Sequence, residues 1–193
     1  MSSIVIDEKY EECRRLLKES ISKKRYMHSI GVSNTSACLA MRYDSDVYKA
    51  YMAGLLHDCA KGLDEKDLIN TCVDAGLSVS PTERDNPELL HSKAGSVLAK
   101  GLYKVNDKDI LDAIIYHTTG RPEMTMLEKI VFVADYIEPN RTNLPDLNEL
   151  RQIAFTDIDL AVCRMCELTL NHLRRADKPI DRLTEETYEY YRR

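Results

Sequence analysis

Histidine is scarce in this chain, and one of the five histidines lies beside an aspartate. The pair His57-Asp58 follows the apolar run Ala53-Gly54-Leu55-Leu56. Imidazole nitrogens together with carboxylate oxygens suit Fe, Mn, Zn or Mg better than soft metals. Neighbouring residues on a helix lie about 100° apart, so both side chains can face one metal only where a helix ends or bends. The position of the pair after an apolar run predicts such a helix end.

Four more residues could join this pair in metal or phosphate chemistry. His28 lies near the start of a predicted helix, His91 starts another, and His117 ends a third. Asp135 lies within the apolar run IVFVADYI. A carboxylate in so apolar a helix must be paired or coordinated, because its burial without a partner is costly. The alternative for the histidines is an ordinary core or surface role, and that is the role we expect for His172.

Composition and charge exclude several classes of protein. The chain has 27 basic and 32 acidic residues and a formal net charge of −5, whereas an extended nucleic-acid footprint needs the opposite sign. Small anionic substrates remain compatible, because they respond to a local field. No basic stretch followed by an apolar run begins the chain, and no apolar run is long enough to span a membrane. We therefore expect a cytoplasmic protein that binds neither nucleic acid nor a membrane.

The six cysteines are interpreted as reduced thiols, mostly on the apolar faces of helices, because nothing in the sequence indicates secretion. Cys163 and Cys166 have the spacing of half a zinc site. No second pair accompanies them, so the metal interpretation is not favoured.

The elements that must position these residues are predicted to be helices. Only 7 glycines and 6 prolines interrupt 193 residues, and no alternation typical of strands is found. The polar, turn-rich segment 78–87 is expected to be a mobile loop, and 140–146 is expected to be a second loop. We predict an all-α, single-domain protein. The expected helices cover 8–22, 26–41, 46–58, 64–75, 88–102, 107–117, 125–138, 157–176 and 183–193.

Five segments together resemble the HD-domain metal phosphohydrolases, an all-helical superfamily, and within it the symmetrical bis(5′-nucleosyl)-tetraphosphatases. The resemblance extends from about Arg25 to Ala161. It implies an HD-domain helical bundle over 1–193, with a metal core at about 25–140. The C-terminal helices, 147–193, would then pack on this core and contribute to the nucleoside pocket. The five segments are RYMHS (25–29), LLHDCAK (55–61), HS (91–92), HTTGR (117–121) and FVADYIEPNR (132–141).

The resemblance also implies a metal, a reaction and a division of labour. The metal would be iron, as one or two ions, with Mn, Zn or Mg as substitutes. The substrate would be diadenosine tetraphosphate (Ap4A), which would be cleaved to two ADP. His91 and His117 would complete a second metal site or a phosphate site. A carboxylate such as Asp58 can bridge two cations about 3.5–4 Å apart, the arrangement that suits phosphoester hydrolysis by activated water. The implied metal ligands are His28, His57, Asp58, His91, His117 and Asp135.

Several residues near these ligands are expected to contact the substrate. Lys61 and Arg141 are placed to offset phosphate charge, and Arg25 and Arg121 are weaker candidates. Each of these cations could instead be a solvated surface charge, and Thr118 could be a helix cap rather than a phosphate ligand. The expected catalytic residues are Asp58, Lys61, His91 and His117. The expected substrate-binding residues are His28, Asp58, His91, His117, Thr118, Asp135 and Arg141, with the nucleoside contacted by Lys178, Pro179, Ile180, Asp181, Arg182 and Leu183.

Two alternatives stay open at this point. Another HD phosphohydrolase, acting on a nucleoside mono- or triphosphate or a cyclic nucleotide, would need the same ligands. A nucleotide-sensing module would bind a ligand such as ADP or GDP without turning it over, but a sensor is expected to have lost a ligand. A homodimer is an expectation from the family alone.

Overall fold

The computed structural model describes residues 7–142, 144 and 146–192, and within them every regular element is a helix. The prediction of an all-α protein is confirmed. The predicted domain 1–193, the predicted loop 140–146 and the predicted last helix 183–193 include residues 1–6, 143, 145 and 193, which lie outside the described residues. The elements are α1 (Glu8–Ser20), α2 (Lys23–Arg42), α3 (Val47–Leu56), α4 (Glu65–Asp74), α5 (Pro81–Asp85), the 3-10 helix η1 (Pro87–Leu90), α6 (His91–Gly101), α7 (Lys108–Tyr116), α8 (Met126–Ile137), α9 (Leu147–Ala154), α10 (Ile158–Arg175) and α11 (Arg182–Tyr191).

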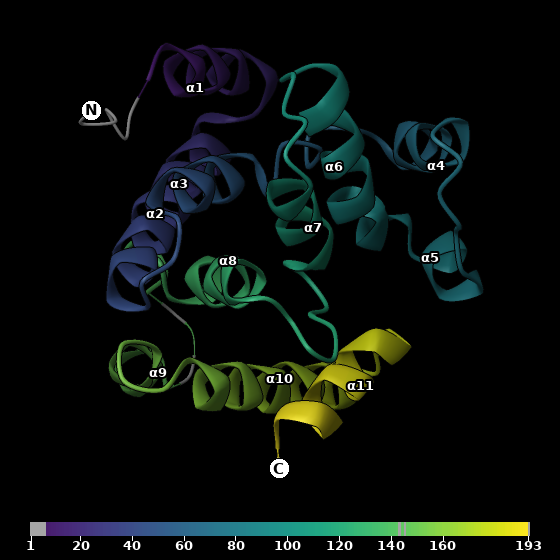
Figure 1. Ribbon diagram of the computed structural model, residues 1–193. Coiled ribbons are helices and arrows are strands. Elements are labelled where there is room, and N and C mark those ends of the chain that lie inside the picture. The colour runs from purple at the N-terminus through teal and green to yellow at the C-terminus, as the bar shows by residue number, and fades with distance from the viewer. Residues whose placement is uncertain (1–6, 143, 145, 193) are drawn as a thin grey trace.

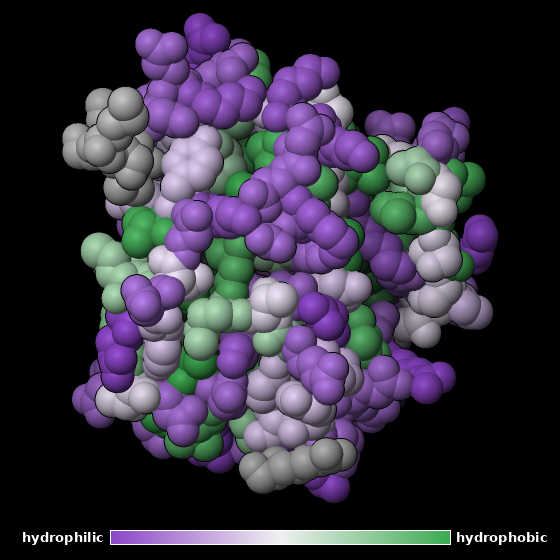
Figure 2. Space-filling view, in the orientation of Figure 1, coloured by the Kyte–Doolittle hydropathy of each residue, from purple (hydrophilic) through white to green (hydrophobic). Residues whose placement is uncertain are grey.

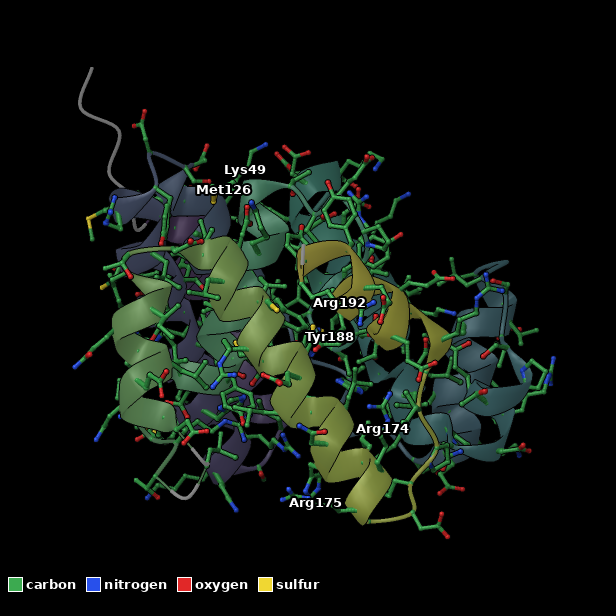
Figure 3. The ribbon with its side chains drawn as sticks, turned by 90° about the horizontal axis from the view of Figure 1, so that it is seen from below. Lys49, Met126, Arg174, Arg175, Tyr188 and Arg192 are labelled. Carbon is green, nitrogen blue, oxygen red and sulfur yellow. The ribbon has the colours of Figure 1, made fainter. Side chains whose placement is uncertain are left out.

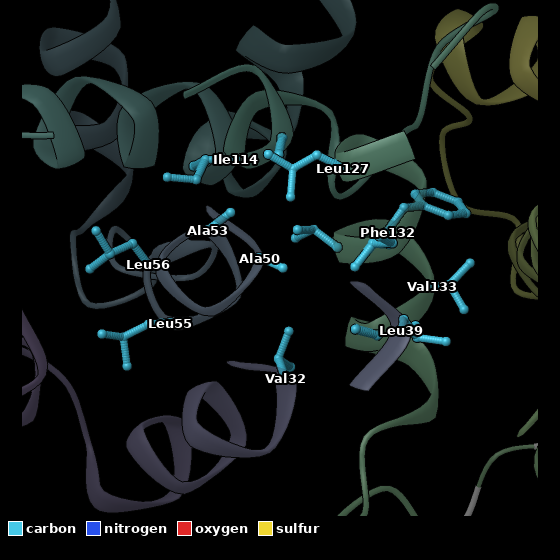
Figure 4. Close-up of a cluster of buried hydrophobic side chains, with 14 of the residues drawn as sticks. Val32, Leu39, Ala50, Ala53, Leu55, Leu56, Ile114, Leu127, Phe132 and Val133 are labelled. Atoms are coloured by element: carbon cyan, nitrogen blue, oxygen red, sulfur yellow. The ribbon is translucent and has the colours of Figure 1, made fainter. Parts of the chain in front are cut away.

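The helices α2, α3, α7 and α8 form the centre of the molecule (Figure 1). Helices α4 to α6 flank them on one side, and α9 to α11 lie below them in this view. Apolar side chains from the four central helices meet in one cluster, which includes Val32 of α2, Leu56 of α3, Ile114 of α7 and Val133 of α8 (Figure 4). Burial of each large aliphatic side chain contributes about 1.5–3 kcal/mol to stability.

Three helices, α3, α7 and α8, carry or precede candidate ligands at or near their C-terminal ends. Side-chain caps define where each of the three begins. Asp46 caps α3 and Asp107 caps α7, each by accepting hydrogen bonds from first-turn amides. Thr125 and Glu128 form a reciprocal capping box at the start of α8. Such caps satisfy amides that have no partner within the helix. The start of each helix is therefore defined by local interactions. A defined start in turn fixes the position of His57 after α3, of His117 after α7 and of Asp135 on α8.

Helices α2 and α3 approach each other closely at Gly54. A Cβ at this position would lie 2.9 Å from Ser33 Cα and 2.8 Å from Ser36 Oγ. Backbone atoms of α2 cannot move aside as the end of a flexible side chain can. Glycine at this position is therefore what allows the end of α3, and the His57-Asp58 pair after it, to lie against α2.

We expect Gly54→Ala to lower the free energy of unfolding by about 1–3 kcal/mol, the usual range for overpacking a core. Gly101→Ala is the matched control, because a Cβ added at this helical glycine meets nothing within 4 Å. Alanine is the better helix former by about 1 kcal/mol, so the control should be neutral or slightly stabilised. Urea denaturation of both variants measures the difference, and equal stability of Gly54→Ala and the wild type would contradict the close approach.

The predicted mobile loop at 78–87 is wrong in part, because it contains the helix α5. Ser80 and Glu83 form a capping box, and a proline occupies the first turn of the helix. The buried Glu83 carboxylate also pairs with Lys93 Nζ of α6 at 2.7 Å. Burial alone would raise the pKa of Glu83, but the hydrogen bond from Lys93 outweighs it and lowers the pKa. The sequence S-P-x-E at residues 80–83 is the local signature of this cap.

The C-terminal helix α11 packs beside α10 and is tied to the segment that follows α7. Thr187 Oγ1 donates to the Thr119 carbonyl at 3.0 Å, and the Met124 amide donates to the Tyr191 hydroxyl at 3.0 Å. Viewed from below, Tyr188 of α11 and Arg192, which follows the helix, lie side by side (Figure 3), with the guanidinium 5.8 Å from the ring centroid. Through Thr187, α11 is held against Thr119, two residues after His117.

Polar side chains cover most of the face shown in Figure 2. Among the described residues, no helix has the length and apolar character needed to cross a membrane. All six cysteines are free thiols, and four of them are buried, as expected. Leu160, which shares the helical register of the apolar residues of α10, is nevertheless largely exposed.

Candidate metal centre

Six side chains from α2, α3, α6, α7 and α8 converge on one point of the interior. His57 ends α3 and Asp58 follows it, whereas His117 ends α7. The other three come from within or at the start of helices. His28 lies on α2, His91 is the first residue of α6, and Asp135 lies on α8. The five predicted helices therefore bring all six predicted ligands together.

Three of the histidines are oriented by the helix ends on which they lie. The Nδ1 atoms of His57, His91 and His117 donate to the carbonyls of Gly54, Glu88 and Ile114, at 2.7, 2.6 and 2.7 Å. Each acceptor lies three residues earlier: Gly54 and Ile114 belong to the last turns of α3 and α7, and Glu88 belongs to η1, directly before α6. A carbonyl can only accept, so Nδ1 carries the proton and Nε2 keeps its lone pair in the neutral ring. These histidines are thus prepared to act as metal ligands through Nε2.

His28 is oriented differently, by the buried carboxylate of Glu138. His28 Nδ1 lies 3.1 Å from Glu138 Oε1, and Glu138 Oε2 accepts from the amide of Asn140 at 2.7 Å. Gly31, one turn after His28, leaves the space for this carboxylate, because a Cβ there would lie 2.2 Å from Oε2. A carboxylate behind a ligating histidine fixes the ring and increases its basicity. We did not predict Glu138; its signal was a single glutamate at the end of an apolar helix.

The Nε2 atoms face one another across short distances. His28 and His57 approach to 3.3 Å, and His91 and His117 approach to 3.2 Å. Burial lowers the pKa of His57 to about 4 and that of His91 to about 3. Both rings are therefore neutral at pH 7, and their lone pairs point into the space between the six side chains.

Both carboxylates of the cluster are ionised. Burial alone would raise the pKa of Asp58, but the histidines around it lower that pKa well below the ordinary value. Burial likewise opposes ionisation of Asp135, and the hydrogen bond from His28 at 3.0 Å lowers its pKa nevertheless. Arg141 Nη2 adds a contact to Asp135 Oδ1 at 2.7 Å. The expectation that a carboxylate in α8 must have a partner is confirmed.

Asp58 lies between two groups of histidines. Its Oδ1 is 3.4 Å from His91 Nε2 and 3.6 Å from His117 Nε2. Its Oδ2 is 3.6 Å from His57 Nε2 and 3.9 Å from His28 Nε2. His91 and His117 lie beside the His57-Asp58 pair because α7 packs against both α3 and α6.

The donor set fits divalent metal. Three groups of side chains offer ligand atoms that lie within 4.8 Å of one another. Each group consists of histidines and aspartates, so all of its donor atoms are nitrogen or oxygen. Neutral imidazole and carboxylate are the ligands that divalent transition metals take. Asp58 belongs to two of the groups, so it can bridge two cations. The groups are His28, His57 and Asp58; His57, His117 and Asp135; and Asp58, His91 and His117.

Cationic and hydroxyl side chains surround the cluster. Arg25, a weaker candidate by sequence, lies with its Nη1 atom 2.9 Å from Asp58 Oδ2. Lys61 is mostly buried, and its charge lowers the pKa of His91 further than burial alone. Thr118 Oγ1 lies 3.1 Å from His91 Nε2 and 3.2 Å from His117 Nε2. Arg121, in contrast, pairs with the buried Glu128 at 3.0 Å and is not part of the cluster.

Two hollows adjoin the cluster. The α6–α11 hollow, of about 360 Å³, includes Ser92 and Thr119, which neighbour His91 and Thr118 in the chain. Asp181, Arg182 and Leu183 line it, whereas the preceding three residues of the predicted nucleoside segment do not. The α2 hollow, of about 450 Å³, is lined by Ser22, Lys24, Arg25, Met27, His28, Glu138, Asn140 and Arg141.

The HD-domain family model matches residues 25–140, the stretch that contains all six candidate ligands. The chain belongs to the HD-domain family. Asp58, of the His57-Asp58 pair, lies within 3.9 Å of all four histidine Nε2 atoms of this cluster. His172, the one histidine outside the cluster, is exposed, as expected.

Comparison with known proteins extends the likeness beyond the HD domain. The chain is 38% identical to the symmetrical bis(5′-nucleosyl)-tetraphosphatase of Bacillus subtilis strain 168, over 93% of this chain and 96% of that protein. It is 35% identical to the protein of the same name from Staphylococcus aureus strain NCTC 8325, over 94% and 93%. A crystal structure of a predicted HD superfamily hydrolase involved in NAD metabolism from Clostridium acetobutylicum superposes with a TM-score of 0.91 at 38% identity, over 94% of this chain and 96% of that one.

Proposed function

We propose that this protein hydrolyses Ap4A to two ADP at a divalent-metal centre formed by its six histidine and aspartate ligands. The convergence of all six ligand atoms around Asp58 carries the proposal for metal-dependent hydrolysis. Two relatives that carry the name symmetrical tetraphosphatase, and that match over more than nine-tenths of both chains, support the choice of substrate. The reaction consumes one water, since Ap4A and water together give two ADP.

The ligands proposed for the metal are His28, His57, Asp58 and Asp135, with His91 and His117 completing a second position. All donors are nitrogen or oxygen, which suits iron, and Mn, Zn or Mg could substitute. Divalent cations bound here would neutralise phosphate charge and lower the pKa of a water. We infer iron as the native metal from the family resemblance.

The cations of the site have a role that follows from where they lie. Arg25 and Arg141 contact the two carboxylates of the cluster at 2.9 and 2.7 Å, so a polyphosphate over the cluster comes within their reach. Lys61 lies on the His91 side. Donors held in place at the positions where charge develops stabilise a transition state without reorganisation. Thr118 is proposed to donate its hydroxyl to a phosphate oxygen.

The α6–α11 hollow is the proposed nucleoside pocket. Its volume of about 360 Å³ falls within the range of small-molecule sites, about 300–1,000 Å³. Asp181, Arg182 and Leu183, at the start of α11, line it. Lys178, Pro179 and Ile180 directly precede them outside the hollow, and they are proposed to contact the part of the nucleoside that extends beyond it. The C-terminal helices would in this way complete a single domain over 1–193, whose metal core is at about 25–140.

Chromatography of the products of Ap4A tests this function. If attack occurs at the phosphorus that leaves two diphosphates, ADP is the sole product from the start of the reaction. Equal amounts of AMP and ATP would overturn the symmetrical assignment. Absence of turnover on Ap4A, with turnover on a nucleoside mono- or triphosphate or a cyclic nucleotide, would favour the other HD phosphohydrolases, and ADP or GDP binding without turnover would favour a sensor.

The cellular setting follows from the proposed substrate. Dinucleoside polyphosphates and ADP are cytoplasmic nucleotides, so we place the reaction in the cytoplasm. A homodimer stays an expectation from the family, and sedimentation of the purified protein measures it directly.

A further inference from the structure

The two hollows are related to opposite oxygens of Asp58 through the residues beside them. Ser92 and Thr119, which follow His91 and Thr118 in the chain, line the α6–α11 hollow, and His91 Nε2 lies 3.4 Å from Asp58 Oδ1. The α2 hollow includes Arg25 and His28, which face Oδ2 at 2.9 and 3.9 Å. A ligand that entered one hollow and left by the other would therefore pass over the middle of the metal cluster.

The α2 hollow combines positive charge with one exposed apolar side chain. Lys24, Arg25 and Arg141 line it, and the N-terminus of α2 adds the positive end of a helix dipole. Its one carboxylate, that of Glu138, is already engaged by His28 and Asn140. Met27 is 47% exposed among these polar groups. An isolated exposed methionine is ordinary on a surface, but here it borders a cationic hollow of about 450 Å³.

Positive charge beside an apolar surface is complementary to a nucleoside diphosphate. The phosphates pair with the lysine and arginines, whereas the flat base can pack against the polarisable thioether of methionine. The volume of the hollow is large enough for a nucleoside.

We propose that the α2 hollow binds the second nucleoside diphosphate half of the substrate, with Met27 against its base, while the α6–α11 hollow binds the first half. This inference rests on the proposed function. A molecule with two identical halves would then lie across the cluster with its central phosphates over Asp58. Attack at the centre of the chain, and hence two equal products, follows from this placement of the two halves.

Met27→Ala tests the proposal, with Met41→Ala as its matched control. Met41 lies on the same helix, is 65% exposed, and is 14 residues away, about 21 Å along the axis. Both changes remove the same exposed side chain, so neither is expected to impair folding. The substrates are Ap4A and adenosine 5′-tetraphosphate, which lacks the second nucleoside.

Met27→Ala is expected to lower kcat/KM for Ap4A, mainly by raising KM. The decrease should be about fivefold larger for Ap4A than for adenosine 5′-tetraphosphate. Loss of a partly buried methionine contact has about this size. Met41→Ala should leave both values unchanged. Equal effects of Met27→Ala on the two substrates, or no effect on either, would overturn the second subsite.

A binding measurement separates failure of this inference from failure of the proposed function. The metal-loaded protein is titrated with a β,γ-methylene analogue of Ap4A, which cannot be cleaved at its centre, and with ADP. Met27→Ala should weaken the analogue about fivefold more than ADP. If the wild type did not hydrolyse Ap4A, the proposed function would be wrong, and the loss of affinity for the analogue relative to ADP would still test binding in the α2 hollow. If the wild type hydrolysed Ap4A and Met27→Ala weakened the analogue and ADP equally, only the second subsite would be wrong.

Discussion

Asp58→Ala is expected to abolish hydrolysis of Ap4A, with kcat lowered by about 10³-fold or more. The Asp58 carboxylate lies within 3.4 to 3.9 Å of the Nε2 atoms of His91, His117, His57 and His28. It belongs to two of the three groups of ligand atoms that converge here. Its removal therefore takes a donor from both metal positions at once, and the metal content of the purified variant should fall together with kcat.

Asp74→Ala is the control for this variant, because Asp74 is an exposed aspartate at the end of α4, away from the cluster. Asp58→Asn adds a second test, since it keeps the shape of the side chain and removes the charge. The thermal transition of each variant shows whether it is folded. A folded Asp58→Ala protein that kept half of the wild-type kcat would rule out Asp58 as the central ligand.

His91→Ala and His117→Ala are expected to lower kcat by about 10²-fold or more while each variant keeps roughly one metal per chain. Both rings face Asp58 Oδ1, whereas His28 and His57 face Oδ2. Loss of His91 or His117 should therefore weaken one position and leave the other. His57→Ala should lose both metals, because the His57 ring contacts the rings of both His28 and His117.

The control for the histidine variants is His172→Ala, whose exposed side chain lies on α10. Metal content, kcat and melting temperature are measured on the same preparations. If His91 and His117 only completed helix ends, their loss would change the melting temperature and leave kcat nearly unchanged. Near-normal turnover in His117→Ala would end the two-metal interpretation.

The helices were predictable because their signals are local. Asp46, Asp64, Asp107 and Asp157 each cap a helix whose apolar period is evident in the sequence. The central helices of the fold and the six ligands could be named for this reason. The short helix α5 was missed, because a five-residue helix has no period and only its cap predicts it.

The arrangement of the ligands could not be predicted from the same signals. That His91 and His117 lie beside Asp58 depends on the packing of α7 against α3, which are separated by about 50 residues of chain, and of α6 against α7. The same holds for Glu138, which contacts a histidine 110 residues away. By sequence, Arg25 could instead be a solvated surface charge, whereas the fold places its guanidinium 2.9 Å from Asp58 Oδ2.

Elemental analysis of the active wild-type protein tests the central claim most directly. Protein purified with and without oxygen is assayed on Ap4A, and its bound metals are measured per chain. We expect between one and two divalent transition-metal ions per chain, with iron predominant in the anaerobic preparation, and loss of activity when a chelator removes them. Active protein with no more than a trace of metal would contradict the account.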